Sequence, residues 1–384
     1  MNRLNQLAEI HQSGKPYIIY KSQKGFDLYT NFSQKIILSN KNIKSFLNKK
    51  NRYKSKNTDL FIGFFGYELL NNLIDVKVPK QKNFNFPKGI FYKPEKKIKL
   101  NNSLRYNKKS YESGNFKINI NRKTYRKIFN RFKKKIKSGE TYQIKICTKY
   151  KTQSKIDPLD FFSRLSSTNL APEAFMVKDN NYSIISCSPE NLITKKGSNI
   201  STKPIAGTLK KTEHLNKLKA LNYFRKNIKE TKEHNMIVDM ERNDLSRICK
   251  VGSVKLSKQK IVEEYKDLFH YVSLIKGELK SKINNIDIIK AMMPGGSVIG
   301  CPKISTLNLL NKQEKENRNI YTGSFGYIKF NGDMRFNIII RSLLNYKNIS
   351  EIAVASGVIL GSTATNEYNE NFIKAKSLLD IFKS

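Results

Sequence analysis

Acidic residues are scarce in this chain of 384 residues, and tryptophan is absent. Lys plus Arg number 72 against 31 Asp plus Glu, so the formal net charge is +41. Such a basic excess can indicate a nucleic-acid-binding protein. The lysines are nevertheless spread along the whole chain, and no nucleic-acid-binding motif accompanies them. A basic nucleic-acid-binding protein therefore stays only as an alternative from another functional class, and we expect no nucleic-acid partner.

Cysteines and long apolar runs are also few. Cys147, Cys187, Cys249 and Cys301 lie far apart and form no CxxC pair, which argues against a disulfide framework or a zinc site. No apolar run approaches the ~18 residues of a membrane-spanning helix. The first residues lack the apolar stretch of a signal peptide. We therefore expect a cytoplasmic protein with reduced thiols and no membrane partner.

The order of the predicted elements favours an α+β fold. Residues 1–115 alternate short strand-like runs with Lys- and Asn-rich connections, whereas residues 116–384 hold denser helices and strands. The strands come in groups without strict βαβ alternation, which is typical of largely antiparallel sheets covered by helices. We expect an N-terminal portion at 1–115 and the chemistry at 116–384. Helices are predicted near 122–138, 157–166, 214–247, 285–292, 302–312 and 367–382.

The second region holds polar motifs, each of which has an ordinary structural explanation when taken alone. KPIAGT (203–208) predicts a turn, and the charges of KEHNMIVDMERNDLSR (232–247) predict a helix with salt bridges. MMPGGSVIGCPKIS (292–305) predicts a glycine-rich loop, which can turn backbone N–H groups and a hydroxyl toward an anion.

Two further motifs place charged residues next to apolar segments. Arg341 falls within the predicted apolar strand FNIIIRSLL, and a buried arginine needs a carboxylate partner. The acids of TNEYNENF (365–372) open an amphipathic helix, where the helix dipole favours negative charge. A solvated first turn is the simpler explanation of these acids until the other motifs are considered with them.

In their order along the chain, these motifs resemble the chorismate-utilising family, which includes anthranilate synthase component I, aminodeoxychorismate synthase component I, and isochorismate and salicylate synthases. The resemblance covers residues 115–384, and FIGFFGYEL (61–69) also resembles part of the family's N-terminal region. It implies the family's fold, an α/β sandwich of two large, mainly antiparallel sheets with outer helices. It also implies that chorismate binds between the sheets.

The resemblance further implies a Mg²⁺ site. Glu233, in EHNMIVD, and Glu370, in NEYNE, match the two carboxylates that hold Mg²⁺ in the family. Glu367 matches a further acid beside the metal. Hard cations prefer oxygen ligands, which would explain why a chain poor in acids keeps these three. Mg²⁺ would bridge them to the ring carboxylate of the substrate.

Other residues match groups that contact chorismate in the family. Glu190, in SPE, matches the acid that protonates the departing C4 hydroxyl, and His270, in FHYVS, matches a histidine implicated in chemistry at the ring. Because chorismate carries two carboxylates, grips on both ends would fix its orientation. The remaining matches are the turn Gly207 and Thr208, Ser297 near the ring, Tyr321, Arg341 and the backbone of Ala355, Ser356 and Gly357 at the enolpyruvyl carboxylate, and the neighbouring Lys374.

One position distinguishes the nucleophiles used in the family. Gln143, in GETYQIKI, lies where isochorismate and salicylate synthases have a lysine that activates water. A neutral amide cannot act as that base, so the resemblance points to ammonia. No amidotransferase signature occurs in the chain, and a separate glutamine amidotransferase subunit that supplies ammonia is therefore implied.

Two features disagree about the product. Ala206 stands in the turn where some aminodeoxychorismate synthases have lysine, as PIKGT, whereas anthranilate synthases and a subset of aminodeoxychorismate synthases have alanine there. The aminodeoxychorismate branch is resembled by two motifs, PGGSVIGCPK and YTGSFGY. We also find no Leu-Glu-Ser element of the kind that forms a tryptophan feedback site. We expect 4-amino-4-deoxychorismate, for para-aminobenzoate and folate biosynthesis. The alternative is anthranilate with pyruvate, for tryptophan biosynthesis.

Overall fold

The structure, a computed structural model, describes residues 3–78, 86–101, 104, 106, 112–265 and 268–383. Its helices are α1 Arg3–Gln12, α2 Ile43–Asn48, α3 Tyr67–Leu73, α4 Arg122–Lys137, α5 Pro158–Asn169, α6 Lys217–Lys226, α7 Ile228–Ile248, α8 Asn285–Met292, α9 Lys303–Gln313 and α10 Ala364–Leu379, with the short 3₁₀ helices η1 Gly296–Val298 and η2 Asp380–Lys383. Its strands are β1 Tyr17–Ser22, β2 Gly25–Ile37, β3 Leu60–Phe65, β4 Gly89–Leu100, β5 Glu112–Ser113, β6 Lys117–Ile118, β7 Gln143–Lys155, β8 Glu173–Lys178, β9 Tyr182–Ser188, β10 Asn191–Lys196, β11 Asn199–Lys203, β12 Ile205–Lys210, β13 Lys255–Glu264, β14 Leu268–Glu278, β15 Gly300–Cys301, β16 Ser324–Lys329, β17 Met334–Asn337, β18 Ser342–Tyr346 and β19 Ile349–Val358.

The longer strands form one antiparallel hydrogen-bonded run. One half of the run is β7, β19, β18, β9 and β8, each paired with the next. The other half is β3, β16, β17, β10, β11 and β14. The N-terminal strands β1, β2 and β4 join the halves, because β1 pairs with β8 and β4 pairs with β3. Strands from both regions of the sequence therefore share one hydrogen-bonded network.

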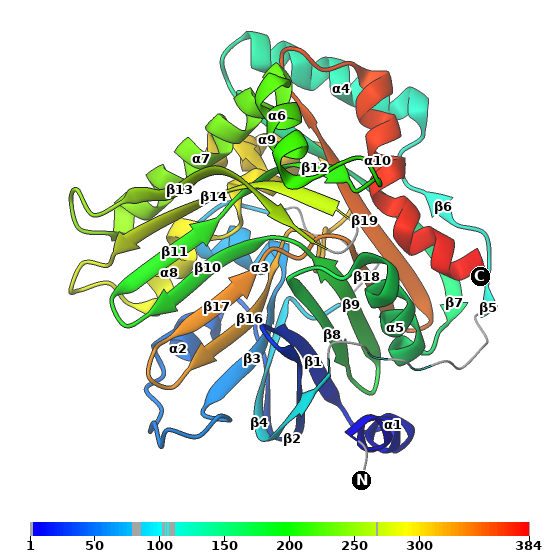
Figure 1. Ribbon diagram of the computed structural model, residues 1–384, viewed down its shortest axis with the longest axis vertical. Coiled ribbons are helices and arrows are strands. Elements are labelled where there is room, and N and C mark those ends of the chain that lie inside the picture. The colour runs from blue at the N-terminus through cyan, green and yellow to red at the C-terminus, as the bar shows by residue number, and fades with distance from the viewer. Residues whose placement is uncertain are drawn as a thin grey trace.

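The run folds over so that its two halves face each other, which confirms the predicted sandwich (Figure 1). Aromatic and branched side chains fill the space between the halves. Phe175 of β8 stacks on Phe325 of β16 with their ring centroids 3.8 Å apart. Helices cover the outer faces, so several strands are buried on both sides, and this explains why they read as apolar runs without alternation.

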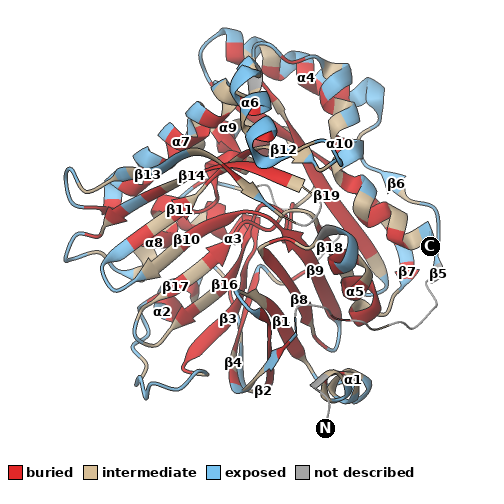
Figure 2. Ribbon diagram, in the orientation of Figure 1, coloured by how far each residue is buried: buried red, intermediate tan, exposed pale blue. Residues whose placement is uncertain are grey.

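The outer helices divide between the two halves. α5 and α10 pack on the half that contains β8 and β9, whereas α2, α3, α7 and α8 pack on the other half. The buried positions lie mainly on the strands, and exposed positions lie on the outward faces of the helices and in loops (Figure 2). The apolar residues of α4 recur at helical spacing and are buried: Tyr125, Ile128, Phe129, Phe132 and Ile136.

Two short segments cross from one half to the other. Residues 189–190 connect β9 to β10, and residues 338–341 connect β17 to β18. The segments run side by side, because the Ile338 N–H donates to the Glu190 carbonyl at 3.1 Å and the Cys187 N–H donates to the Arg341 carbonyl at 3.2 Å. Side chains on these crossings therefore lie where the two halves meet.

The strand predicted around Arg341 is wrong at that residue. Arg341 lies in the crossing just before β18, with a left-handed φ of 49°. The hydrophobic pattern runs unbroken through 338–340, so sequence alone gave no sign that the ladder ends there. The chain leaves β17 to reach the other half, and the apolar residues of the crossing are buried by that passage.

Two other predicted elements differ from the structure. KPIAGT is not a turn: residues 205–210 form β12, with a shift of register against β14 between Ile205 and Thr208. Gly207 has a φ of +93° at this bulge, which explains the need for glycine. The helix predicted at 214–247 is two helices, since the Asn227 side chain ends α6 and caps α7 by accepting from the Glu230 N–H.

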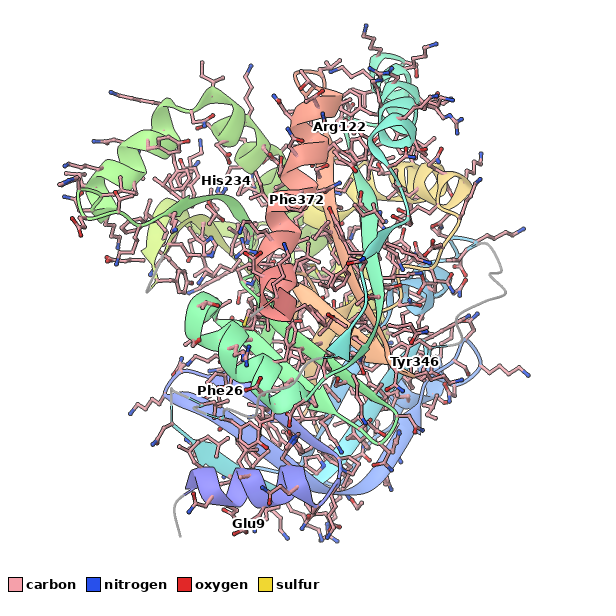
Figure 3. All side chains as sticks on the ribbon, turned by 90° about the vertical axis from the view of Figure 1, so that its right-hand side faces the viewer. Glu9, Phe26, Arg122, His234, Tyr346 and Phe372 are labelled. Carbon is pink, nitrogen blue, oxygen red and sulfur yellow. The ribbon has the colours of Figure 1, made fainter. Side chains whose placement is uncertain are left out.

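The helix predicted at 367–382 begins earlier, at Ala364, after the N-cap Thr363. Its buried side carries Glu367, Asn371, Ala375 and Leu378, whereas Phe372, expected on the apolar face, is 49% exposed. Figure 3 views α10 from its outer side and labels Phe372 there. The acids that open the helix thus belong partly to its buried side.

The cysteines are free thiols, and Cys301 is the most accessible of them. Within the described ranges, no helix is long and apolar enough to cross a membrane.

Candidate active site

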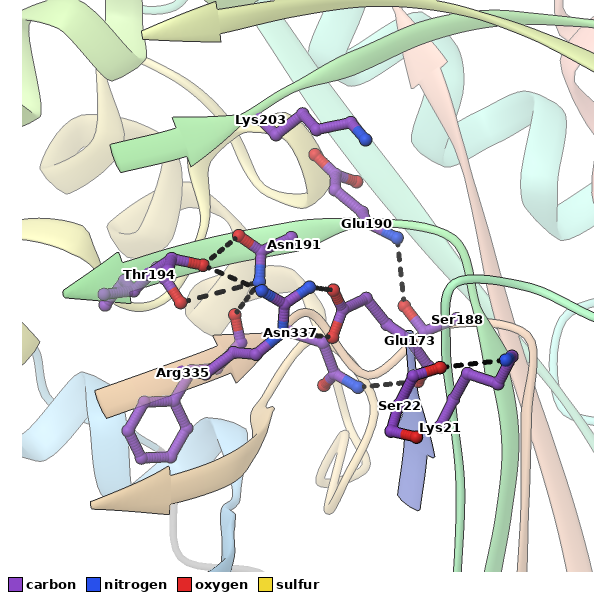
Figure 4. Close-up of polar contacts among 12 residues, drawn as sticks. Lys21, Ser22, Glu173, Ser188, Glu190, Asn191, Thr194, Lys203, Arg335 and Asn337 are labelled. Atoms are coloured by element: carbon purple, nitrogen blue, oxygen red, sulfur yellow. Dashed lines mark hydrogen bonds and ion pairs between the residues drawn. The ribbon is translucent and has the colours of Figure 1, made fainter. Parts of the chain in front are cut away.

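The Glu190 carboxyl group lies on the first crossing and is buried. It accepts a hydrogen bond of 2.8 Å from the Ser297 hydroxyl of η1. Burial raises the pKa of Glu190 to about 7, although Ser297 and nearby cations act in the opposite direction. Figure 4 shows this carboxyl group turned away from the Glu173–Arg335 ion pair. Glu190 can therefore hold a proton near neutral pH, as a general acid must.

Arg341 lies on the second crossing, and its guanidinium makes no hydrogen bond or ion pair with any other residue that the structure describes. Burial lowers the pKa of Arg341, while the Cys187 and Glu190 side chains act to raise it. A buried guanidinium without a protein carboxylate is a ready site for an anionic ligand. The predicted contact of Arg341 with a substrate carboxylate stays a prediction.

Thr208 and His270 face each other across the pair β12–β14. The Thr208 hydroxyl and His270 Nδ1 are 3.0 Å apart. Burial, followed by the Arg341 guanidinium, lowers the pKa of His270 to about 3. The imidazole is therefore neutral near physiological pH and is a weaker base than an exposed histidine. Gly207, beside them, has Phe224 and Glu230 so close that a Cβ would fall 2.7 Å from the Phe224 ring.

Glu233 of α7 meets two side chains of β7. Its Oε1 accepts from Gln143 Nε2 at 3.0 Å and from Lys145 Nζ at 2.9 Å. The Lys145 ammonium, opposed by burial, lowers the pKa of Glu233 to about 2. Burial disfavours the charge of Lys145, but Glu233 outweighs it and raises the pKa of the amine. All three side chains are thus held in one polar cluster.

α10 brings a second carboxylate toward the same cluster. Lys374 Nζ lies 2.7 Å from Glu370 Oε1 and also donates to the Ala355 carbonyl at 2.9 Å. Burial acts to raise the pKa of Glu370, but Lys374 and Lys145 together bring it below its ordinary value. Glu367, buried one turn earlier, also acts electrostatically on Lys145. All three predicted metal ligands thus act on the charge of Lys145, and their role in metal binding stays a prediction.

The end of β19 forms the remaining wall. The Ser356 hydroxyl points to the other face and lies 2.6 Å from the Tyr125 hydroxyl, so only the backbone of this residue can serve the site. A Cβ on Gly357 would fall 2.9 Å from Lys145 Nζ and 3.0 Å from Gln143 Nε2. Tyr321 packs against Ala355, and burial raises its pKa. A ligand can therefore approach the β19 backbone closely.

The chemistry of these donors can be compared with the needs of Mg²⁺. Glu233 and Glu370 offer hard oxygen atoms, and the charge of Glu233 acts on Glu370. Within the part of the chain that the structure describes, however, no group of three or more His, Cys, Asp or Glu side chains is arranged to hold a metal ion. Ammonium groups stand against both carboxylates instead. Glu233 and Glu370 would supply the oxygen atoms for a hard divalent cation, and in this structure each of them is paired with a lysine.

Lys145 was missed by the sequence analysis. It lies two residues after Gln143 on β7, and residues two apart in a strand face the same side. The segment YQIKICTKY, read as a strand around Gln143, therefore contained the signal. Its importance follows from its contact with Glu233, which no local pattern reveals.

The chain is similar to known chorismate-utilising proteins. Residues 7–380 match the family described as chorismate binding enzyme. The chain is 33% identical over 264 residues to aminodeoxychorismate synthase component 1 of Bacillus subtilis (strain 168), which covers 68% of this chain but only 56% of that protein. It is 31% identical over 382 residues to anthranilate synthase component 1 of Buchnera aphidicola subsp. Pemphigus spyrothecae, covering 88% of this chain and 72% of the relative.

A solved structure agrees with the fold. The crystal structure of anthranilate synthase component I from Streptococcus pneumoniae TIGR4 superposes with a TM-score of 0.78 at 25% identity, covering 94% of this chain and 89% of that one. The family match spans almost the whole chain, both halves of the sandwich and every predicted site residue. The chain therefore belongs to the family of chorismate binding enzymes.

Proposed function

We propose that this chain aminates chorismate to 4-amino-4-deoxychorismate, with ammonia supplied by a glutamine amidotransferase partner. The family match supports chorismate as the substrate, and the similarity to aminodeoxychorismate synthase component 1 supports the reaction. The product would feed the synthesis of para-aminobenzoate and folate. Component I of this kind would need a partner because the motifs of an amidotransferase do not occur in this sequence.

The observation that carries amination is the environment of Gln143. Its side-chain amide donates to Glu233 Oε1 at 3.0 Å. A neutral amide cannot remove a proton from water, so this position offers no base to make hydroxide. Ammonia is nucleophilic without losing a proton, which suits a site built in this way.

The site has the Arg341 guanidinium at one end and the proposed metal ligands at the other, which suggests how the substrate lies. The enolpyruvyl carboxylate would meet the Arg341 guanidinium, with Tyr321 and the β19 backbone beside it. The ring carboxylate would lie toward Glu233 and Glu370, where Mg²⁺, when bound, would neutralise negative charge and hold that carboxylate. Fixing both ends would turn the C4 hydroxyl toward a protonated Glu190.

The reaction then consists of two displacements. Glu190 gives its proton to the C4 hydroxyl, which leaves as water while ammonia adds at C2. A second ammonia adds at C4 as the first leaves C2. The net change replaces the hydroxyl group by an amino group and releases water, and the enolpyruvyl group stays on the ring. Ala206 offers no amine, so ammonia or water must add first at C2, or ammonia must reach C4 by another route, and the two displacements above take ammonia for both steps.

Anthranilate synthesis is a second candidate, and Ala206 and His270 favour it. With no lysine in the turn, the ammonia that adds at C2 has no competitor there. His270 matches a histidine implicated in chemistry at the ring, and its imidazole is unprotonated because burial and then Arg341 lower its pKa to about 3, which also makes it a weak base. Loss of that proton together with pyruvate would turn the C2 adduct into anthranilate.

A coupled assay separates the two candidates. The full chain is mixed with chorismate, Mg²⁺ and an ammonium salt at alkaline pH, and a separate aminodeoxychorismate lyase is then added. We expect 4-aminobenzoate that depends on the lyase. Fluorescent anthranilate and pyruvate formed without the lyase would reject the first candidate and favour the second, and isochorismate as main product would reject both.

A further inference from the structure

The Lys145 ammonium is paired with one of the carboxylates proposed to bind the metal. Its Nζ lies 2.9 Å from Glu233 Oε1, and its residue is only 8% exposed. Glu370 and Glu367, the other two carboxylates proposed for the metal, also act on it electrostatically. A single lysine thus interacts with every side chain proposed to bind Mg²⁺.

The second nearby lysine is placed differently. Lys374 shares its Nζ between Glu370, at 2.7 Å, and the Ala355 carbonyl, at 2.9 Å, and it belongs to the same helix as Glu370. Lys145 instead reaches from β7 to a carboxylate on α7. These two ammonium groups offset part of the negative charge of the three carboxylates, and Glu367 also acts electrostatically on Lys133.

Lys145 has little room to retreat toward the nearest strand. A Cβ on Gly357 of β19 would fall 2.9 Å from its Nζ, so the ammonium already lies against that backbone. A divalent ion that binds Glu233 must therefore either repel this charge at short range or displace it. Both processes make binding of the divalent ion less favourable, and neither would arise if residue 145 were neutral.

We propose that Lys145 is a tethered cation that competes with the divalent metal for Glu233 and thereby weakens metal binding to the substrate-free enzyme. The proposal rests on the proposed function, because it takes the metal site from there. A substrate carboxylate beside the site would give the displaced ammonium a new partner. Metal and substrate would then strengthen each other's binding, as linkage requires.

The test measures binding of Mn²⁺ to the substrate-free full chain by electron paramagnetic resonance of the free ion. Lys145→Met removes the charge and keeps most of the stem, and Lys145→Arg keeps the charge. We expect Lys145→Met to bind Mn²⁺ about tenfold more tightly or better, and Lys145→Arg to stay close to the wild type. In Lys145→Met with Glu233→Gln, the gain should disappear. Should Lys145→Met fail to fold by circular dichroism, Lys145→Gln replaces it.

The outcomes separate this inference from the proposed function. Equal Mn²⁺ affinity in the wild type and in the neutral variants would overturn the inference and leave the proposed reaction standing. Absence of Mn²⁺ binding in all variants would overturn both the metal site and the role of Lys145. A gain in Lys145→Arg as large as in Lys145→Met would show that packing, and not charge, governs binding, and would also overturn the inference.

Discussion

The carboxyl group of Glu190, on the first crossing, is buried and accepts a hydrogen bond from Ser297 of η1. Burial raises its pKa to about 7. The family resemblance predicted the residue and its role, but not this environment. The crossings 189–190 and 338–341 create the environment, and the second of them was hidden in a continuous apolar pattern that predicted a strand. Residue identity was readable from sequence, whereas burial and contact partners required the fold.

The proposed general acid gives a prediction with a pH dependence. Glu190→Gln should lower kcat by roughly 10²–10⁴ with a much smaller change in KM, because a general acid acts in the transition state. In the wild type, kcat should fall as the pH rises through about 7, since the protonated form of Glu190 is lost. The falling limb should be missing in the variant. Steady-state kinetics across pH measures both, and a change confined to KM would assign Glu190 to binding.

The same shift has a consequence for stability. The pKa of Glu190 is about 7 in the folded chain and ~4.3 in an unfolded one. Between these values the folded state binds more protons, so its contribution to the free energy of unfolding declines as the pH rises through that window. Glu190→Gln should flatten this decline, which urea titrations at several pH values can measure. An unchanged slope would show that the folded carboxyl group is not shifted.

The proposed metal ligands give a second prediction at the residue scale. Glu370→Ala and Glu233→Ala should each lower activity by roughly a hundredfold or more while the fold is kept, and activity should require Mg²⁺. Glu264→Ala is a matched control, because Glu264 is an exposed carboxylate paired with Lys211. Activity assays over a range of Mg²⁺ concentrations measure the effect. Near-normal turnover of either site variant at limiting Mg²⁺ would discard the metal assignment.

At the scale of elements, periodic segments were predicted well and irregular ones were not. The apolar face of α4 and the span of α8 agree with the sequence pattern, because helical spacing is a local property. The bulge in β12 was predicted as a turn, since Gly207 supports either conformation. The break between α6 and α7 at Asn227 depends on a capping contact that periodicity does not show.

The absence of a side chain at Gly357, near the end of β19, gives a prediction about how closely a ligand approaches this strand. Gly357→Ala should impair chorismate binding and turnover by roughly tenfold, because its Cβ would meet Lys145 Nζ and Gln143 Nε2 at or below 3.0 Å. These are ends of side chains, so they can move and the melting temperature should change little. Gly361→Ala is the control, since no atom lies within 4 Å of its added Cβ. Equal kinetics in the two variants would show that close approach to β19 is not needed.

At the scale of the whole molecule, the sandwich was predicted but its continuity was not. Strand pairing over long distances, such as β1 with β8 and β3 with β16, leaves no trace in a local pattern. The division of the sequence near residue 115 reflects a change in the density of motifs, and it stays a prediction about domains. The high positive charge is compatible with this fold because exposed positions lie mainly on helices and loops.

The N-terminal strands that link the two halves of the sandwich give a prediction about the folding of the entire chain. A fragment of residues 116–384 should not fold cooperatively, although it contains every proposed site residue. Without β1 and β3, the strands β8 and β16 lose hydrogen-bonded partners, and the stacked pair Phe175 and Phe325 loses its surroundings. Circular dichroism melts and limited proteolysis against the full chain measure this. A fragment that melts cooperatively and binds chorismate would contradict the prediction.

The two crossings also limit how the length of this chain can change during evolution. Only two residues join β9 to β10, and only four join β17 to β18. An insertion or deletion in either segment would move Glu190 relative to Ser297, or Arg341 relative to His270, and would break the backbone bonds between the segments. Surface loops can lengthen at small cost. Length variation among functional relatives should therefore be absent at these two places and collect in the loops.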